Sequence, residues 1–354
     1  MSNPDQHPDE TPCESAPAHN GRAIEIISPR DVPLGGLRAM TVRRTLPQRS
    51  RSLIGAWCFL DHYGPDDVSM TGGMNVPAHP HTGLQTVSWL FSGEIEHRDS
   101  AGFHATVRPG ELNLMTAGHG ISHSERSTPE TTALHGAQLW VALPAHARGG
   151  GKGFAHYAPP VVNGAGWRAQ VFLGALLGAH SPVATHTELL GAELGLDPGA
   201  QLELELDPSF EHGVLVDTGA VAIRAGRSAR SAPGARAATD AVTVAKDHLA
   251  YLPPGTARIT LTATSPEPTR LLLIGGEPLG ERIVMWWNFI GTDHDEIARA
   301  RADWQAQLAD AGVADVAAPS GEGDPTRFGL PEGEPEPPLP APPLPIARLL
   351  PRRQ

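Results

Sequence analysis

Cysteine is scarce in this sequence of 354 residues, which contains only Cys13 and Cys58. Two cysteines are too few for the disulfide framework that holds small secreted domains together. Cys58 lies in an apolar run, so we expect it to be a small hydrophobic residue inside a core. The length of the chain is sufficient for two domains, each with a core of its own.

Positive charge and long apolar runs are also in short supply. The 27 Lys and Arg residues face 39 Asp and Glu residues, giving a net charge of −12 and a pI near 5.8. Proteins that grip phosphate backbones depend on clustered Lys and Arg, so no direct nucleic-acid partner is expected. No run approaches the roughly 18 to 20 apolar residues that span a bilayer, and the N-terminus lacks the features of a signal peptide. We therefore expect a cytoplasmic protein with no membrane partner.

Glycine (39) and proline (35) are plentiful, which favours many short strands and turns. Strand-like runs fill residues 22–148 and 167–293, and a glycine- and proline-rich linker is expected at 149–166. The predicted fold is all-β, with two antiparallel β-barrels. Residues 294–312 have apolar positions at helical spacing, with Trp304 facing inward. The ends, 1–21 and 313–354, are polar, acidic or proline-rich and are expected to be disordered tails.

Two histidine-containing pairs stand out within residues 74–126. They are His79-Pro80-His81 and His123-Ser124-Glu125, separated by two alternating apolar and polar runs. Residues two apart on a strand share one face, so each pair can aim both members the same way. If the two strands are neighbours, three imidazoles and a carboxylate converge, a set suited to a divalent transition metal. The spacing predicts a metal site that leaves positions open for chemistry, in the first barrel only, since the second set of strands has no such pair.

Other polar residues near these pairs allow more than one interpretation. Asp61 and His62 end an apolar strand, where they either support the metal ligands from behind or cap the following turn. His119 precedes His123 on a glycine-flanked loop and is a candidate active-site histidine that does not bind the metal. His97 and Asp99 are expected to brace backbone groups in a turn.

The two pairs, with the glycines at positions 73, 93 and 120, resemble the paired motifs of the cupin superfamily. Within it, HPHTGLQTVSWLFSGEIEHRDSAG followed by MTAGHGISHSE closely resembles the pirin family. The resemblance covers about residues 22 to 312 and implies a monomeric bicupin with iron bound by His79, His81, His123 and Glu125. One departure from the general cupin pattern is Gln85, where many cupins carry an acidic ligand. In pirins Glu125 supplies the carboxylate instead.

The resemblance implies a metal-dependent dioxygenase that opens a flavonol such as quercetin and releases carbon monoxide. Its substrates would be a small aromatic molecule and dioxygen, with Glu125 both a metal ligand and the catalytic base. Fe(II) is the expected metal, and Ni, Mn, Zn and Cu are alternatives that the ligand types also allow. The competing hypothesis is an iron-dependent, redox-sensing cofactor of transcription that binds a protein partner without catalysis. An open pocket leading to the metal would favour the enzyme.

Overall fold

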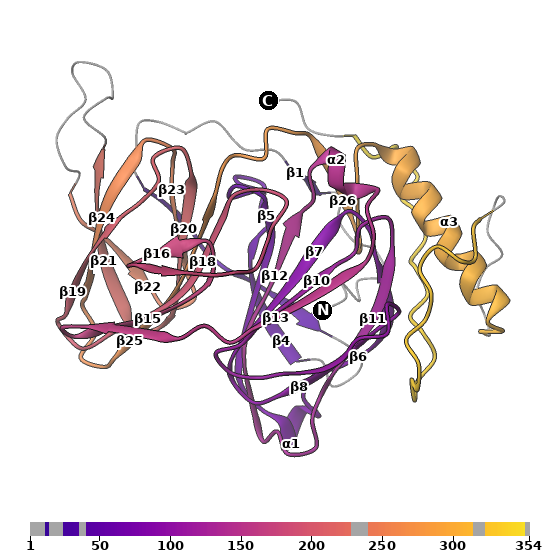
Figure 1. The fold of residues 1–354 in the computed structure, drawn as a ribbon, viewed down its shortest axis with the longest axis horizontal. Helices are drawn as coiled ribbons and strands as arrows, with labels where there is room; N and C mark the ends of the chain where they lie inside the picture. Colours follow the sequence, from indigo (N-terminus) through magenta and orange to yellow (C-terminus); the bar gives the residue numbers. More distant parts are fainter. Residues whose placement is uncertain (1–10, 14–23, 35–39, 228–239, 314–322, 351–354) are drawn as a thin grey trace.

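The computed structural model describes residues 11–13, 24–34, 40–227, 240–313 and 323–350. Within them the chain forms two β-barrels side by side, with one long helix at the far side of the first barrel (Figure 1). The predicted all-β fold with two barrels is confirmed. No helix among the described residues has the length and apolar character needed to cross a membrane.

The first barrel consists of a seven-stranded and a four-stranded antiparallel sheet. The order in the larger sheet is β13 (Gly153–Tyr157), β10 (Leu112–Thr116), β7 (Leu84–Ser92), β12 (Ala133–Ala142), β5 (Trp57–Asp67), β4 (Met40–Leu46) and β3 (Arg30–Leu34). The order in the smaller sheet is β6 (Asn75–His81), β11 (Ile121–Ser127), β8 (Ile95–Asp99) and β9 (His104–Val107). Two short helices, α1 (Val68–Thr71) and α2 (Ala145–Arg148), follow β5 and β12.

The second barrel repeats this plan. Its larger sheet has the order β14 (Val161–Gly164), β15 (Trp167–Leu173), β18 (Leu189–Leu196), β25 (Thr269–Gly276), β20 (Glu211–Thr218), β23 (Leu249–Leu252) and β2 (Glu25–Ile27). Its smaller sheet has the order β19 (Gln201–Glu205), β24 (Thr256–Ala263), β21 (Ala220–Arg227) and β22 (Val242–Ala245). The hairpin β16 (Ala175–Leu176) and β17 (Ala179–His180) lies before β18.

The two barrels exchange edge strands. Strand β2, from the start of the chain, pairs with β23 of the second barrel, and β13 pairs with β10 of the first. The expected linker at 149–166 therefore contains two paired strands, β13 and β14, and the predicted boundary at residue 22 places β2 with the wrong barrel. Both differences arise because strand pairing joins residues far apart in sequence, which local composition does not reveal. The larger sheets pack on each other through a buried apolar cluster that includes Trp57, Trp89 and Phe172.

The C-terminal part begins with strands β26 (Ile283–Trp286) and β27 (Phe289–Gly291), followed by α3 (His294–Asp310). Asp293 caps α3 by accepting a hydrogen bond from the Glu296 backbone N–H. The buried face of α3 includes Ile297 and Trp304, so the predicted helix and its inward Trp304 are confirmed. Strand β26 also pairs with β1 (Thr11–Cys13), which lies inside the expected N-terminal tail; the rest of residues 1–21 lies outside the described residues.

The proline-rich segment 323–350 contains no helix or strand, but it is packed against the protein, which corrects the expectation of a disordered tail over this range. It runs between α3 and the first barrel (Figure 1). The Trp304 indole N–H donates to Leu339 O, and the Leu339 N–H donates to Ala78 O on β6. Phe328 is fully buried in the cluster around α3. A side chain of α3 and a backbone carbonyl of β6 thus supply hydrogen-bond partners that a proline-rich segment cannot supply for itself.

Candidate metal centre

Strands β6 and β11, which carry the two histidine pairs, are antiparallel neighbours in the smaller sheet of the first barrel. His79 stands opposite His123 in their register. His79, His81, His123 and Glu125 are all completely buried. The alternate residues on β11, Ser122 and Ser124, instead donate hydrogen bonds to the C-terminal segment outside the sheet. The alternation expected of a strand therefore turns the four predicted ligands into the barrel.

The three histidines surround one point. One nitrogen from each of His79, His81 and His123 lies within 4.8 Å of the other two. The Nε2 atoms of His81 and His123 are 3.1 Å apart. Two nitrogen ligands at right angles around an ion, each about 2.1 Å from it, would be about 3 Å apart. The spacing of these nitrogens therefore suits a shared metal ion.

Hydrogen bonds fix which nitrogen of each ring carries the proton. His79 Nδ1 lies 2.9 Å from Pro77 O and His81 Nδ1 lies 3.3 Å from Asn288 O. A carbonyl oxygen only accepts, so the proton is on Nδ1 and the lone pair is on Nε2 in both rings. His79 Nε2 is buried without a hydrogen-bond partner among the described residues. Such a lone pair, facing other imidazoles, is what a metal ion would satisfy.

Burial keeps these imidazoles neutral. It lowers the pKa of His79 to about 3, because a charged ring would lose its hydration inside the barrel. The pKa values of His81 and His123 are also held well below their usual range by burial and by the charge that neighbouring histidines would carry. Neutral imidazole is the form that binds a metal, so no proton has to leave before binding at neutral pH.

His97 is a member of the site that the sequence analysis missed. It stands opposite Glu125 in the register of β8 and β11, and one atom from each of His97, His123 and Glu125 lies within 4.8 Å of the others. His97 Nδ1 is 3.4 Å from His123 Nδ1, and its Nε2 is 3.1 Å from Asp99 Oδ2. The carboxylate holds the proton on Nε2 of His97, which leaves Nδ1 to accept from His123 and leaves Nε2 of His123 with a lone pair.

The spacing of His97 and Asp99 in the sequence could have identified His97 as part of the site. His97 and Asp99 are two residues apart, as the members of the two histidine pairs are, but they were interpreted as turn residues. Asp99 does brace the turn, since its Oδ1 accepts from the N–H groups of Ala101 and Phe103. His97 is instead buried on the strand.

Polar side chains from the larger sheet surround Glu125. The Ser88 hydroxyl oxygen lies 2.9 Å from Gln138 Oε1 and 3.4 Å from Glu125 Oε1. The Tyr63 hydroxyl is buried without a hydrogen-bond partner among the described residues. Burial raises its pKa well above the usual value, and the negative charges of Glu125 and Asp61 add to this. The barrel interior therefore offers uncharged hydroxyl and amide groups close to the carboxylate.

Three predicted supporting residues lie elsewhere. Asp61 is buried and accepts two hydrogen bonds, at 2.7 and 2.8 Å, from the guanidinium group of Arg44. His119 is exposed and lines a separate cavity of about 310 Å³ together with Arg148 and Arg327. Neither residue belongs to the groups of possible metal ligands found among the described residues.

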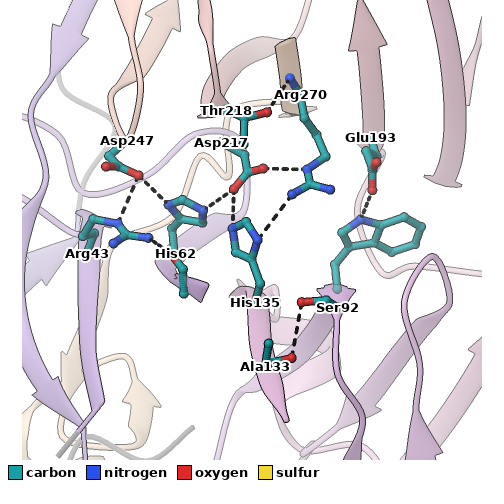
Figure 2. A network of polar contacts seen from close by, with 12 residues as sticks. Arg43, His62, Ser92, Ala133, His135, Glu193, Asp217, Thr218, Asp247 and Arg270 are labelled. Atoms are coloured by element: carbon teal, nitrogen blue, oxygen red, sulfur yellow. Dashed lines mark hydrogen bonds and ion pairs between the residues drawn. The ribbon is translucent and has the colours of Figure 1, made fainter. Parts of the chain in front are cut away.

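His62 takes part in a polar network that joins the two barrels (Figure 2). Its Nε2 is 2.7 Å from Asp217 Oδ1, and its Nδ1 is 3.2 Å from Asp247 Oδ1. His135 Nε2 is also 2.6 Å from Asp217 Oδ1. Burial alone would raise the pKa of the Asp217 carboxyl, but its contacts with His135 and His62 hold it well below the usual value. Asp217, on β20, therefore fastens the second barrel to β5 and β12 of the first.

This network groups two histidines with a carboxylate, as a metal site does. The Arg270 Nη2 atom, however, lies 3.3 Å from His135 Nδ1. A guanidinium only donates, so His135 carries its own proton on Nε2, which faces Asp217. That nitrogen has no lone pair for a metal, and the network is a set of hydrogen bonds and ion pairs between the barrels.

The fold and the histidine cluster define a two-barrel cupin protein, and comparisons with known proteins agree. The Pirin family model matches residues 39–141, and the model of the Pirin C-terminal cupin domain matches residues 191–309. The chain belongs to the pirin family.

Two relatives illustrate the likeness in sequence. A Pseudomonas aeruginosa protein to which quercetin 2,3-dioxygenase activity is provisionally assigned is 38% identical over 346 residues, covering 98% of each chain. A pirin-like protein of Caulobacter vibrioides is 33% identical and covers 75% of this chain and 88% of its own.

Two solved structures show the same fold. A quercetin 2,3-dioxygenase of Acinetobacter baumannii is 34% identical, with a TM-score of 0.78, and the alignment covers 92% of this chain and 98% of that one. A bacterial pirin of Escherichia coli in complex with nickel(II) is 19% identical, with a TM-score of 0.53, covering 72% of this chain and 99% of that one.

Proposed function

We propose that this protein is a metal-dependent dioxygenase that opens the ring of a flavonol such as quercetin and releases carbon monoxide. The observation that carries the proposal is the convergence of the Nε2 lone pairs of His79, His81 and His123 beside Glu125 inside the first barrel. The relatives from Pseudomonas and Acinetobacter, both described by quercetin 2,3-dioxygenase activity, support the choice of substrate.

The three histidines and Glu125 would hold the metal, with Fe(II) as the expected ion. When bound, the metal supplies a Lewis acid and a path for electrons between an enolic substrate and dioxygen. His97 acts behind His123, because its contact with Asp99 directs the lone pair of His123 toward the ligand cluster.

Glu125 would take the proton of the substrate hydroxyl on a carboxylate oxygen. The Ser88 hydroxyl has one proton and lies between Glu125 and Gln138. It can donate to Glu125 while the carboxylate is charged and turn toward Gln138 Oε1 when Glu125 is protonated. The Tyr63 hydroxyl and the Gln138 amide nitrogen, which have no hydrogen-bond partner within the described part of the chain, would be available to orient substrate oxygens.

The first test combines metal content with oxygen uptake. The full-length chain is reconstituted anaerobically with Fe(II), its metal is measured by mass spectrometry, and oxygen consumption is followed on adding quercetin. His123→Ala and Glu125→Ala are compared with His104→Ala, which removes an exposed imidazole that contacts Glu96 on the same sheet. We expect one metal per chain in the wild type and in His104→Ala.

His123→Ala should lose the metal and Glu125→Ala should lose at least about 100-fold in turnover, the range of a general base. A protein that holds one metal per chain but consumes no oxygen with flavonols would rule out the dioxygenase and leave the metal site standing. Metal binding that survives His123→Ala unchanged would rule out the site itself.

A further inference from the structure

The second barrel contains a cavity of about 490 Å³ at one end. The segment 174–190, which includes the β16–β17 hairpin, forms one side, and residues 205–212 form the other. Leu176, Leu190, Leu206 and Phe210 provide apolar lining. Small-molecule sites have volumes of roughly 300 to 1,000 Å³ and mostly apolar walls with few polar groups. The size of this cavity falls in that range, and its lining combines these apolar side chains with polar ones.

Two buried polar residues line the cavity wall. They are Ser181, whose hydroxyl oxygen accepts a hydrogen bond from the Val183 N–H, and His212, the second residue of β20. Neither ring nitrogen of His212 has a hydrogen-bond partner among the described residues. Burial lowers the pKa of His212 to about 4, so the ring is neutral at pH 7 and has one N–H donor and one acceptor nitrogen. Buried polar groups are nearly always paired, because an unpaired one is costly. A molecule in the cavity would supply the pairing.

The neighbouring strand is built to accommodate this ring. His212 stands opposite Gly275 on β25, and a Cβ atom at Gly275 would lie 2.7 Å from His212 Cδ2. Any larger residue at position 275 would displace the imidazole. Further along the same two strands, Val214 and Leu273 belong to the apolar core. The polar ring of His212 thus lies next to that core.

The cavity is lined in part by the start of β20, the strand that corresponds to β7 of the first barrel. Strand β20 lies between β23 and β25, as β7 lies between β10 and β12. Strand β7 begins three residues after His81, and β20 likewise follows the end of β19. By this correspondence His212, the second residue of β20, matches Gln85, the second residue of β7, and both side chains are buried.

The charges around the cavity restrict its ligand. Among the described residues its lining includes the carboxylates Glu188, Glu205 and Asp207 and no Lys or Arg, so an anion would be repelled. These carboxylates are exposed, whereas the buried part of the lining has a neutral imidazole, the Ser181 hydroxyl and apolar side chains. A buried positive charge would have no neighbouring negative charge there.

We propose that this cavity binds an uncharged, hydroxyl-bearing molecule of one or two rings, whose hydroxyl group shares a hydrogen bond with His212 and whose rings pack on Phe210 and Leu190. The site is separate from the histidine cluster and requires no metal. The proposal of a ligand in this cavity and the proposal of dioxygenase activity in the first barrel can therefore be contradicted independently.

Fluorescence titration of the metal-free, full-length protein tests the proposal with two probes of the same ring system. The first, 2-naphthol, is uncharged at pH 7 and has one hydroxyl group, and the second, 2-naphthoate, is an anion. We expect 2-naphthol to bind one site in the wild type and equally well in His123→Ala. His212→Leu, which keeps the bulk of the side chain, should weaken this binding at least about fivefold, as loss of one hydrogen bond does. The affinity for 2-naphthoate should be at least about tenfold lower.

Unchanged affinity in a folded His212→Leu variant, or loss of 2-naphthol binding in His123→Ala, would overturn the proposal. If His212→Leu does not fold, crystals of the wild type soaked with 2-naphthol decide the question. Electron density for the probe against His212 supports the site, and density confined to the first barrel or to the surface overturns it.

Discussion

In the first barrel, the smaller sheet turns His79, His81, His123 and Glu125 into the interior, and all four are buried. In the second barrel, the corresponding strands β19 and β24 place four apolar residues there instead, with the same alternation and the same antiparallel pairing (Leu202, Leu204, Ile259 and Leu261). One strand order therefore supports either a polar or an apolar interior. The function lies in the residues that the shared backbone presents, and the fold alone does not set it.

The residues of the two interiors also contribute differently to the free energy of unfolding. Each buried leucine or isoleucine of the second barrel stabilises the fold by about 1.5 to 3 kcal/mol. A buried imidazole without a partner, such as His79 Nε2, destabilises it by about 1 to 3 kcal/mol. The histidine cluster therefore lowers the stability of the metal-free first barrel, and a bound metal would add stability by mass action.

Making the first barrel resemble the second should have the largest effect on metal content. In the double variant His79→Leu and His123→Ile, metal content after reconstitution should fall at least about tenfold, because two of the three imidazole ligands are gone. The metal-free variant should be more stable than the metal-free wild type by about 1 to 3 kcal/mol, since an unpaired polar group is replaced by an apolar one. Mass spectrometry and urea unfolding measure the two quantities.

The matched control is His104→Leu, which makes the same kind of change at an exposed position of the same sheet. It should alter neither quantity. A double variant that still binds one metal per chain would show that the histidine cluster is not the metal site.

The next prediction concerns a variant that destabilises the second barrel and changes no residue of the first. Leu261→Ala removes a fully buried side chain that packs in the core of the second barrel. It should cost about 2 to 5 kcal/mol in the free energy of unfolding, because it leaves a cavity. Metal content should stay at the wild-type level. A loss of metal with this variant would mean that the second barrel shapes the site more directly than its separate core suggests.

The single buried imidazole of the second barrel predicts a pH dependence. The pKa of His212 is about 4 in the folded protein, against about 6.5 for an ordinary histidine. Between these values the unfolded chain binds a proton that the folded chain does not, so stability falls as the pH drops from 6.5 to 4. The contribution of His212 reaches about 3 kcal/mol at most.

This prediction is tested by the difference between two proteins, because other buried histidines also respond to acid. Urea unfolding of the wild type and of His212→Leu is measured at pH 7 and at pH 4.5. The wild type should lose more stability than the variant over this range. Equal losses would show that His212 is not a neutral, buried ring.

The sequence revealed those parts of the site that depend on local periodicity. The spacing of His79 with His81 and of His123 with Glu125 was enough to place each pair on one face of a strand, because side chains alternate along a strand. The helix of residues 294–310 followed from its 3.6-residue pattern in the same way. In both cases the information lies within a few residues of the chain.

Features that depend on distant partners could not be predicted in this way. The pairing of β2 with β23 joins residues more than 200 positions apart, and nothing in the first segment identifies its partner. The place of His97 in the site follows from the register of β8 against β11, which the sequence does not state. The proline-rich segment 323–350 is packed because Trp304 and other residues of α3 hold its backbone, which a composition rule cannot detect.

That segment provides the smallest predicted effect and a further contrast between the barrels. In the first barrel it covers the outer face of the sheet that carries the proposed metal ligands. Glu334 accepts a hydrogen bond from the Ser124 hydroxyl at 2.6 Å and lies 2.7 Å from Arg126 Nη1. Since Ser124 stands between His123 and Glu125, this contact restrains the strand from which both of them project.

Glu334→Gln keeps the shape of the side chain but removes its charge, so it should cost about 1 kcal/mol in the free energy of unfolding. Glu332→Gln, an exposed position two residues away, is the control and should cost less than about 0.5 kcal/mol. Metal affinity should fall by about two- to threefold in Glu334→Gln alone, because a less restrained β11 loses more conformational freedom when its ligands are fixed. If both variants show wild-type metal affinity, the segment stabilises the barrel but does not position the ligands.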